Sequence, residues 1–176
     1  MTEMSALRET AEAWLAAEPD ADMREELGAL LHGSEQDLRD RFTGRLQFGT
    51  AGLRAAVGVG PQRMNRLVVQ QAAAGLVEYL LAHVPDVADA GVLIGYDMRR
   101  KSDAFALDTA RVCAARGVKA LLFDQIVPTP VLAWNITALG AAAGVMVTAS
   151  HNPPADNGYK VYLATVQLGT STTTGD

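Results

Sequence analysis

A serine, a histidine and an asparagine follow one another in residues 148–153, which read Thr-Ala-Ser-His-Asn-Pro, and Lys160 comes shortly afterwards. The apolar run over 141–147 predicts a buried strand, and the proline predicts that this strand ends in a loop. Ligands of open α/β sheets bind outside the carboxyl ends of the strands. We therefore expect the hydroxyl, the imidazole and the ammonium to meet at a site for nucleophilic or proton-transfer chemistry.

Two further segments bring glycines or acidic groups together with cations. Residues 48–54 read Phe-Gly-Thr-Ala-Gly-Leu-Arg, so backbone N–H groups are free to face an anion, and Arg54 offers a fork of donors for a phosphate. Residues 95–101 read Gly-Tyr-Asp-Met-Arg-Arg-Lys, which places one carboxylate and three cations after an expected strand. Each segment also has a purely structural interpretation, as a glycine-rich turn in the first case and as a solvated loop in the second.

The serine segment fits none of the common nucleophile or phosphate-loop templates. The sequence has no Gly-x-Ser-x-Gly elbow, no Gly-x-x-x-x-Gly-Lys-[Ser/Thr] loop and no complete dinucleotide fingerprint. The three histidines, His32, His83 and His151, are too scattered for a recognisable zinc signature. What remains is a serine with cations and glycines around it, which are the parts needed to hold a phosphoryl group on an oxygen and to stabilise it during transfer.

The composition of the 176-residue chain is that of a folded protein with a sizeable core, because 49% of its residues are hydrophobic. The net charge of −5 gives no indication of a nucleic-acid or anionic-membrane partner. The one cysteine, Cys113, excludes an internal disulfide and a multi-cysteine metal site, and we expect it to be a packed thiol on a helix. Because neither a secretory signal nor a membrane-length apolar run is seen, we expect a cytoplasmic protein.

The hydrophobic spacing divides the chain into regions of different character. Residues 1–43 carry apolar positions at helical spacing and predict a helical arm that covers one side of a domain. The many glycines over 44–64 argue against a helix and favour a loop or an irregular hairpin whose backbone approaches something closely. Asn65 is the expected cap of a long helix that ends near His83.

Strands and helices alternate in the second half of the chain. The expected strands are 92–96, 118–123 and the apolar run that precedes Ser150. One helix is expected to begin at a Ser102 cap, and another to run over 128–139. This order predicts an α/β fold with a mostly parallel sheet and helices on both faces, which is an α/β/α sandwich.

Taken in order, residues 48–54, 95–99, 148–153 and 157–160 (Asn-Gly-Tyr-Lys) resemble the α-D-phosphohexomutase superfamily, and above all its phosphoglucomutase/phosphomannomutase members. The glycine–arginine segment is similar to the branch that holds the phosphopentomutases. The resemblance extends over about residues 44–162 and is most specific in the Thr-Ala-Ser-His-Asn-Pro element. It implies a phosphosugar mutase, an isomerase of carbohydrate metabolism that acts as an intramolecular phosphotransferase.

The resemblance also implies a role for each matched position. Ser150 would carry the phosphoryl group and bind a metal ion through its phosphate, and His151 would line the same loop. Lys160 and Arg54 would be the cations beside the phosphoserine, which makes them candidates for proton transfer and charge stabilisation. The other matched residues would bind the substrate or phosphate, or support the residues that do so: Thr50, Gly52, Asp97, Arg99 and Asn152.

In enzymes of this superfamily the phosphoserine donates its phosphoryl group to a hexose or pentose monophosphate. The resulting bisphosphate turns over in the cleft and returns its other phosphoryl group to the serine. The resemblance therefore implies a sugar 1,6-bisphosphate as activator. It also implies Mg²⁺, which such enzymes bind through the phosphoserine and an Asp-Gly-Asp-x-Asp-Arg loop.

The sequence departs from the superfamily because that aspartate loop and the later sugar-selecting segments are not present in it. We expect an arm over 1–43, the first of four family domains over 44–163, and a frayed or aberrant tail over 164–176. A truncated first domain would have negligible mutase turnover by itself, since little remains to orient the substrate. It would also expose an apolar surface through which it could self-associate. A non-catalytic sugar-phosphate-binding module or an inert remnant is the alternative.

Overall fold

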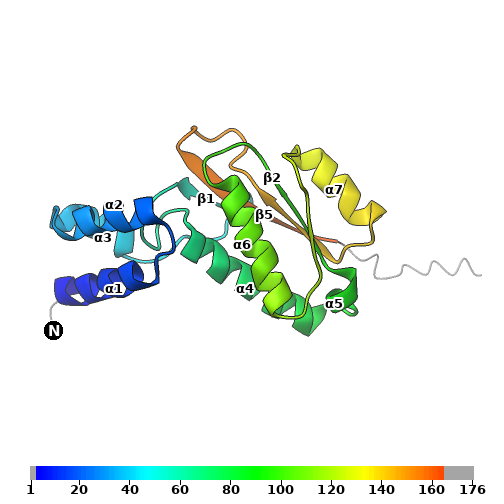
Figure 1. Cartoon of the computed structure of the whole chain (residues 1–176), viewed down its shortest axis with the longest axis horizontal. Coiled ribbons are helices and arrows are strands. Elements are labelled where there is room, and N and C mark those ends of the chain that lie inside the picture. Colours follow the sequence, from blue (N-terminus) through cyan, green and yellow to red (C-terminus); the bar gives the residue numbers. More distant parts are fainter. Residues whose placement is uncertain (1–2, 165–176) are drawn as a thin grey trace, which may run out of the picture.

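The computed structural model describes residues 3–164 of the chain, as an arm of helices beside an α/β domain (Figure 1). Most of the tail expected over 164–176 lies outside the described residues. None of the helices that the structure describes is both long and apolar enough to span a membrane.

The N-terminal arm consists of the three helices α1 (Glu3–Ala17), α2 (Ala21–Leu31) and α3 (Glu35–Phe42), as the helical spacing predicts. The hydroxyl of Ser34 accepts a hydrogen bond from the backbone N–H of Asp37 and so caps α3. The apolar faces of the three helices meet in a small core of their own, which also takes in Val59 of the following segment. Its buried members are Ala11, Met23, Leu27, Leu38, Phe42 and Val59.

The domain is built on a five-stranded mixed sheet in the order β1-β5-β4-β2-β3. The strands are β1 (Leu53–Ala56), β2 (Val92–Tyr96), β3 (Ala120–Leu122), β4 (Ala143–Val147) and β5 (Asp156–Leu163). β2 pairs in parallel with β3 and β4, whereas β5 pairs antiparallel with both β4 and β1. The expectation of a mostly parallel sheet is therefore inexact.

The length of the serine loop explains this correction. Only residues 148–155 separate β4 from β5, and a parallel partner requires a crossover connection of roughly a dozen residues or more. The chain therefore turns back beside β4, with Val147 opposite Tyr159. The motif order predicts that Lys160 returns near the serine loop, but it does not predict a strand around this lysine.

Helices cover both faces of the sheet, as predicted. Alternate residues of β2 point to opposite sides, so Ile94 joins the core beneath α4 (Arg66–His83) and α6 (Ser102–Ala115). Leu93 joins the core beneath α7 (Thr129–Ala138), on the other face. A short helix, α5 (Val87–Ala90), leads into β2. The serine loop thus emerges from a strand that is buried between two helical layers.

Two expected helix caps have different outcomes. Asn65 accepts a hydrogen bond from the N–H of Val68 and caps α4, as predicted. Ser102, however, is the first residue of α6, and Lys101 occupies the cap position with a left-handed φ of 64°. The Ser102 hydroxyl instead donates a hydrogen bond to Asp97 at 2.8 Å, so the prediction of a serine cap is wrong.

Cys113 lies in α6 and is fully buried, as expected for a packed thiol. Burial raises the pKa of this thiol to about 11. The side chain is therefore protonated at neutral pH and acts as an apolar core residue.

Candidate functional site

The serine loop makes a tight turn directly after β4. Ser150 has a φ of 58°, a left-handed conformation that costs a non-glycine residue roughly 1 kcal/mol. Its N–H donates to the hydroxyl of Thr148 at 3.0 Å, and the N–H of Asn152 donates to the carbonyl of Ala149 at 3.1 Å. Because Ser150 itself is exposed, the turn presents the serine to solvent at the carboxyl end of a buried strand.

Arg99 holds the backbone of this loop through four hydrogen bonds. One terminal nitrogen of its guanidinium donates to the carbonyls of Pro153 (2.8 Å) and Asp156 (2.9 Å). The other donates to the carbonyls of Ser150 and Asn152, both at 2.9 Å. A guanidinium has five N–H donors in a fixed plane, so this contact fixes the course of the loop as well as its distance from β2.

Asp97 in turn orients the segment that carries Arg99. One of its carboxylate oxygens accepts from the N–H of Arg99 at 3.0 Å and from the hydroxyl of Ser102 at 2.8 Å. The other lies 3.4 Å from the Arg99 guanidinium. Asn157 adds two hydrogen bonds to this segment. Its amide nitrogen donates to Ser102 Oγ and to the carbonyl of Arg100, both at 2.9 Å.

The glycine-rich segment reaches the same loop from the other side. The backbones of Gly49 and Gly52 exchange two hydrogen bonds around a tight turn that ends at β1. Gly52 has a φ of 85°, and a Cβ there would overlap the carbonyl oxygen of Tyr159, so only glycine fits. The irregular hairpin and the close backbone approach expected from the glycines are both present, and the hairpin leads into a short strand.

Arg54 connects the glycine turn to the serine loop. Its Nε donates to the carbonyl of Ala51 at 3.3 Å, and its terminal nitrogen donates to Oδ1 of Asn152 at 3.1 Å. The amide nitrogen of Asn152 donates to Asp156 at 2.9 Å, so this asparagine is fixed from both ends. The positive charge of Arg54 therefore lies beside the loop that carries Ser150.

A pocket of about 260 Å³ opens between the glycine turn and β5. Arg54 and Lys160 line it together with residues 48–52, Val161 and Tyr162, while Ser150 lies outside its lining. The pKa of Lys160 is lowered mainly by partial burial and further by the charge of Arg54, whereas Asp97 raises it. Two cations and the backbone of a glycine turn around a small space are a suitable environment for a phosphate group.

The structure brings most of the predicted site residues into one connected set. Arg54, Asp97, Arg99 and Asn152 contact the serine loop or its support directly, and Lys160 shares the pocket with Arg54 and Gly52. Thr50 and His151 lie exposed at the tips of the two turns. The sequence motifs do not indicate the supporting roles of Ser102 and Asn157, because both roles depend on contacts between distant segments.

The described residues do not fit a complete magnesium site. Among residues 3–164, no three His, Cys, Asp or Glu side chains converge as a group that could hold a metal ion. Asp97 is already engaged by Ser102 and Arg99. A divalent ion at Ser150 would therefore take its other ligands from outside this part of the chain, because Mg²⁺ requires several oxygen ligands in near-octahedral geometry.

Comparison with known proteins assigns the chain to a family. Residues 45–175 match the family model described as phosphoglucomutase/phosphomannomutase, alpha/beta/alpha domain I. The chain belongs to this family. The resemblance seen in the sequence motifs is therefore confirmed, and the serine loop, the glycine turn and the Asp97–Lys101 segment all lie within the matched range.

Individual relatives of this mutase-family chain carry the names of phosphomutases. A probable phosphoribomutase from Schizosaccharomyces pombe is 46% identical over 89% of this chain and 27% of its own length. A probable phosphomannomutase from Haemophilus influenzae is 55% identical over 60% of the chain and 21% of its own length. A crystal structure from Thermus thermophilus, assigned as a phosphomannomutase, gives a TM-score of 0.61 at 34% identity, covering 69% of this chain and 26% of that one. The chain thus spans about a quarter of the length of these relatives.

Proposed function

We propose that this chain provides the serine that carries the phosphoryl group in a phosphosugar mutase. The observation that supports the proposal best is the position of Ser150. It is exposed on a loop that Arg99 fixes through four carbonyls and that Arg54 joins to a cation-lined pocket. The names of the relatives support a sugar phosphate as the substrate, either a hexose or a pentose phosphate.

The proposed reaction exchanges one P–O bond for another at each step. A hydroxyl oxygen of the sugar monophosphate attacks the phosphorus of phospho-Ser150, the bond from phosphorus to Ser150 Oγ breaks, and the sugar becomes a bisphosphate. The attacking hydroxyl loses its proton to a base, and Ser150 Oγ regains one. In the reverse sense, Ser150 takes the other phosphoryl group from the bisphosphate, so a sugar 1,6-bisphosphate also serves to load the serine.

Arg54 and Lys160 have distinct roles in this proposal. Arg54 stays charged and stabilises the negative charge of the phosphoryl group. Lys160 lies beside it, and its pKa is lowered mainly by partial burial. Since a lower pKa makes the neutral amine more accessible, Lys160 is the candidate for accepting and returning the hydroxyl proton.

In this proposal the whole activity needs groups beyond the described residues 3–164, since the chain spans about a quarter of the length of its relatives. We propose that Mg²⁺ is held by the phosphoserine together with carboxylates from outside residues 3–164. The ion would neutralise charge on the transferring group. Alone, the chain would have negligible turnover, because it offers few groups to orient the sugar.

The test uses the chain joined to the remaining domains of the Schizosaccharomyces pombe relative. Ser150→Ala in this joined enzyme should lower mutase turnover by at least about 10³-fold, because the acceptor oxygen is lost. Ser34→Ala, which removes a helix cap in the arm, is the matched control and should leave turnover within about twofold. Near-normal turnover of the Ser150→Ala enzyme would contradict the proposal.

A second candidate function is a phosphate-binding module without chemistry. The observation that favours it is that the pocket lined by Arg54 and Lys160 does not include Ser150. On this alternative, the joined enzyme would show no turnover even with Ser150 in place, Ser150→Ala would leave sugar-phosphate affinity unchanged, and Arg54→Ala would abolish binding. Calorimetric titration with a sugar bisphosphate is therefore read together with the turnover of the unsubstituted joined enzyme: turnover supports the mutase, and binding without turnover supports the binding module.

A further inference from the structure

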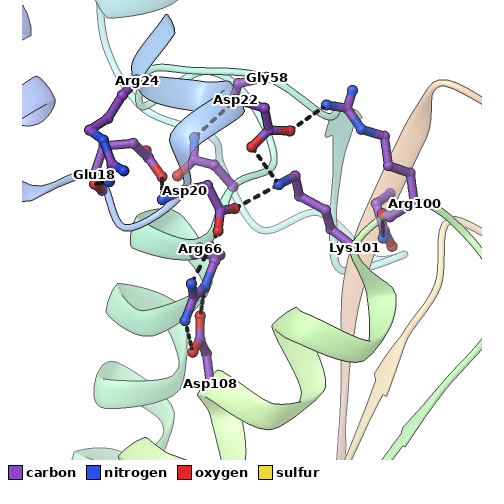
Figure 2. Close-up of polar contacts among 11 residues, drawn as sticks. Glu18, Asp20, Asp22, Arg24, Gly58, Arg66, Arg100, Lys101 and Asp108 are labelled. Carbon is purple, nitrogen blue, oxygen red and sulfur yellow. Dashed lines mark hydrogen bonds and ion pairs between the residues drawn. The ribbon is translucent and has the colours of Figure 1, made fainter. Parts of the chain in front are cut away.

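A network of charged side chains joins the N-terminal arm to Arg100 and Lys101 of the domain (Figure 2). The carboxylate of Asp20, just before α2, accepts from Lys101 Nζ at 2.8 Å and from Arg66 at 3.1 Å. Asp22, in the first turn of α2, accepts from Lys101 and Arg100, both at 3.0 Å. Two acidic residues of the arm therefore bind two consecutive cations of the domain.

The central pair of this network is sheltered from water. The side chains of Lys101 and Asp20 are only 17% and 16% exposed. Arg66 continues the network inward through two hydrogen bonds, at 2.6 and 2.7 Å, to Asp108, which is almost fully buried. Exposed ion pairs contribute little, whereas a sheltered pair in a network is costly to break because one charge is left without a partner.

The backbone of Lys101 is strained at the residue that makes this contact. Lys101 has a φ of 64°, a conformation in which glycine or asparagine is preferred and a lysine is strained. It occupies the cap position of α6 without making a side-chain cap. The strain persists because surrounding contacts over-determine the conformation, and Asp20 and Asp22 supply those contacts.

The turn that carries Lys101 also supports the serine loop. Arg99, two residues before Lys101, donates to four carbonyls of the loop. The carbonyl of Arg100 accepts from Asn157, which also accepts from the N–H of Gly158 at 2.7 Å. The turn of residues 97–101 is therefore held by the arm on one side and holds the serine loop on the other.

We propose that Lys101 is a positioning residue for the serine loop: through Asp20 and Asp22, the N-terminal arm fixes the turn from which Arg99 holds the backbone around Ser150. The family domain matched in the chain begins at residue 45, so the arm adds a support that lies outside this domain. The structural part of the inference is independent of catalysis. Its consequence for turnover rests on the proposed function of Ser150.

The test measures hydrogen exchange of the serine-loop amides in the full 176-residue chain. The reporters are the N–H groups of Ser150, Asn152 and Asp156, each of which is hydrogen-bonded within the loop. Lys101→Gly removes the ammonium and also relieves the backbone strain, so the fold should be retained. We expect these amides to exchange about fivefold to tenfold faster in this variant, while the amides of β2 keep their rates.

Two further variants separate positioning from a general loss of stability. Lys101→Arg keeps the charge and carries the same backbone strain, so it should restore loop exchange to within about twofold of the original rate. Arg39→Gln breaks an exposed ion pair with Glu3 inside the arm and should leave the loop unchanged. Unchanged loop exchange in Lys101→Gly, or equal acceleration in the loop and in β2, would overturn the proposal.

The proposed function is tested separately, by the turnover of the joined enzyme that carries Ser150→Ala. If Lys101→Gly loosens the loop while Ser150→Ala keeps normal turnover, the positioning role stands and the proposed catalytic role fails. If the loop keeps its protection while Ser150→Ala abolishes turnover, the catalytic role stands and the positioning role fails.

Discussion

Two turns flank the serine loop, and their arginines are used in opposite ways. Arg99, in the turn after β2, directs its donors to four backbone carbonyls and is only 16% exposed. Arg54, which follows the glycine turn before β1, makes two side-chain hydrogen bonds and lines an open pocket. One arginine is committed to structure, and the other lines the space in which we propose that a phosphate group binds. A cation next to the serine loop therefore need not be a ligand-binding group.

Removing Arg99 should produce the largest effect. Arg99→Ala leaves four loop carbonyls without their donor, and we expect a loss of about 3 kcal/mol in the free energy of unfolding. Urea denaturation checks this value. Arg111→Ala, which removes a largely exposed arginine from α6, is the control and should change stability by less than about 0.5 kcal/mol. If Arg99→Ala changed the unfolding free energy equally little, the difference that we infer between the two turns would be wrong.

The glycine turn should also be sensitive to a single methyl group. Gly52→Ala forces a Cβ into the carbonyl oxygen of Tyr159 at a positive φ, and we expect a loss of about 2 kcal/mol. Gly75, inside α4, has open space around its Cβ position, so Gly75→Ala should stabilise the chain by about 0.5–1 kcal/mol. Thermal unfolding of the two variants should therefore give shifts of opposite sign. An unchanged or raised melting temperature of Gly52→Ala would show that the close approach at Gly52 is not required.

Arg54→Ala should change stability little and ligand affinity more. Because the removed side chain faces a pocket, we expect a loss below about 1 kcal/mol in unfolding free energy. The affinity for a sugar bisphosphate should fall about tenfold or more, since a charge-assisted contact to phosphate is lost. Calorimetric titration measures the affinity. If Arg54→Ala lowers the unfolding free energy by several kcal/mol while the ligand affinity stays unchanged, the two arginines have been assigned the wrong way round.

The smallest effect concerns the pH dependence of Lys160. Its pKa lies below the ordinary value of 10.5, so the folded chain releases this proton at a lower pH than the unfolded chain does. Between these two pKa values the unfolded chain binds more protons, and stability should therefore rise slightly with pH across that window. Phosphate affinity should fall over the same window because the pocket loses a charge. Lys160→Met should remove both changes, which parallel denaturation and binding series at alkaline pH would detect.

The sequence predicts the layers of the fold better than its strand directions. Helical spacing over 1–43 and the Asn65 cap indicate the helices correctly, because both signals are local. The direction of β5 is set by the short serine loop, and the mostly parallel expectation fails there because no strand is predicted over Asp156–Leu163. Ser102 fits a cap pattern, but a contact with Asp97 competes for its hydroxyl.

The candidate site shows the same division between local and distant information. The motifs indicate Ser150, Arg54 and Lys160 because each of these residues lies in a short segment of distinctive residue types. The contact of Arg99 with four carbonyls depends on the path of the backbone, which residue types do not encode. The link from Asp20 to Lys101 joins residues that are 81 positions apart along the chain, and no spacing rule could have indicated it.

Self-association through an exposed apolar surface stays a prediction. Phe48, Tyr79 and Leu163 line an apolar groove beside the glycine turn, and each is about half exposed. Analytical sedimentation over a range of protein concentrations measures this self-association. A sedimentation coefficient that stays constant with concentration would contradict it.

The most direct test of the phosphoryl-carrying serine is to find the phosphoryl group. The joined enzyme is incubated with a hexose bisphosphate that carries isotopically labelled phosphate, and its peptides are sequenced by mass spectrometry. We expect the label on Ser150, and we expect it to leave the enzyme when a sugar monophosphate is added. Label on another residue, or full turnover without any label on the peptide that contains Ser150, would contradict it.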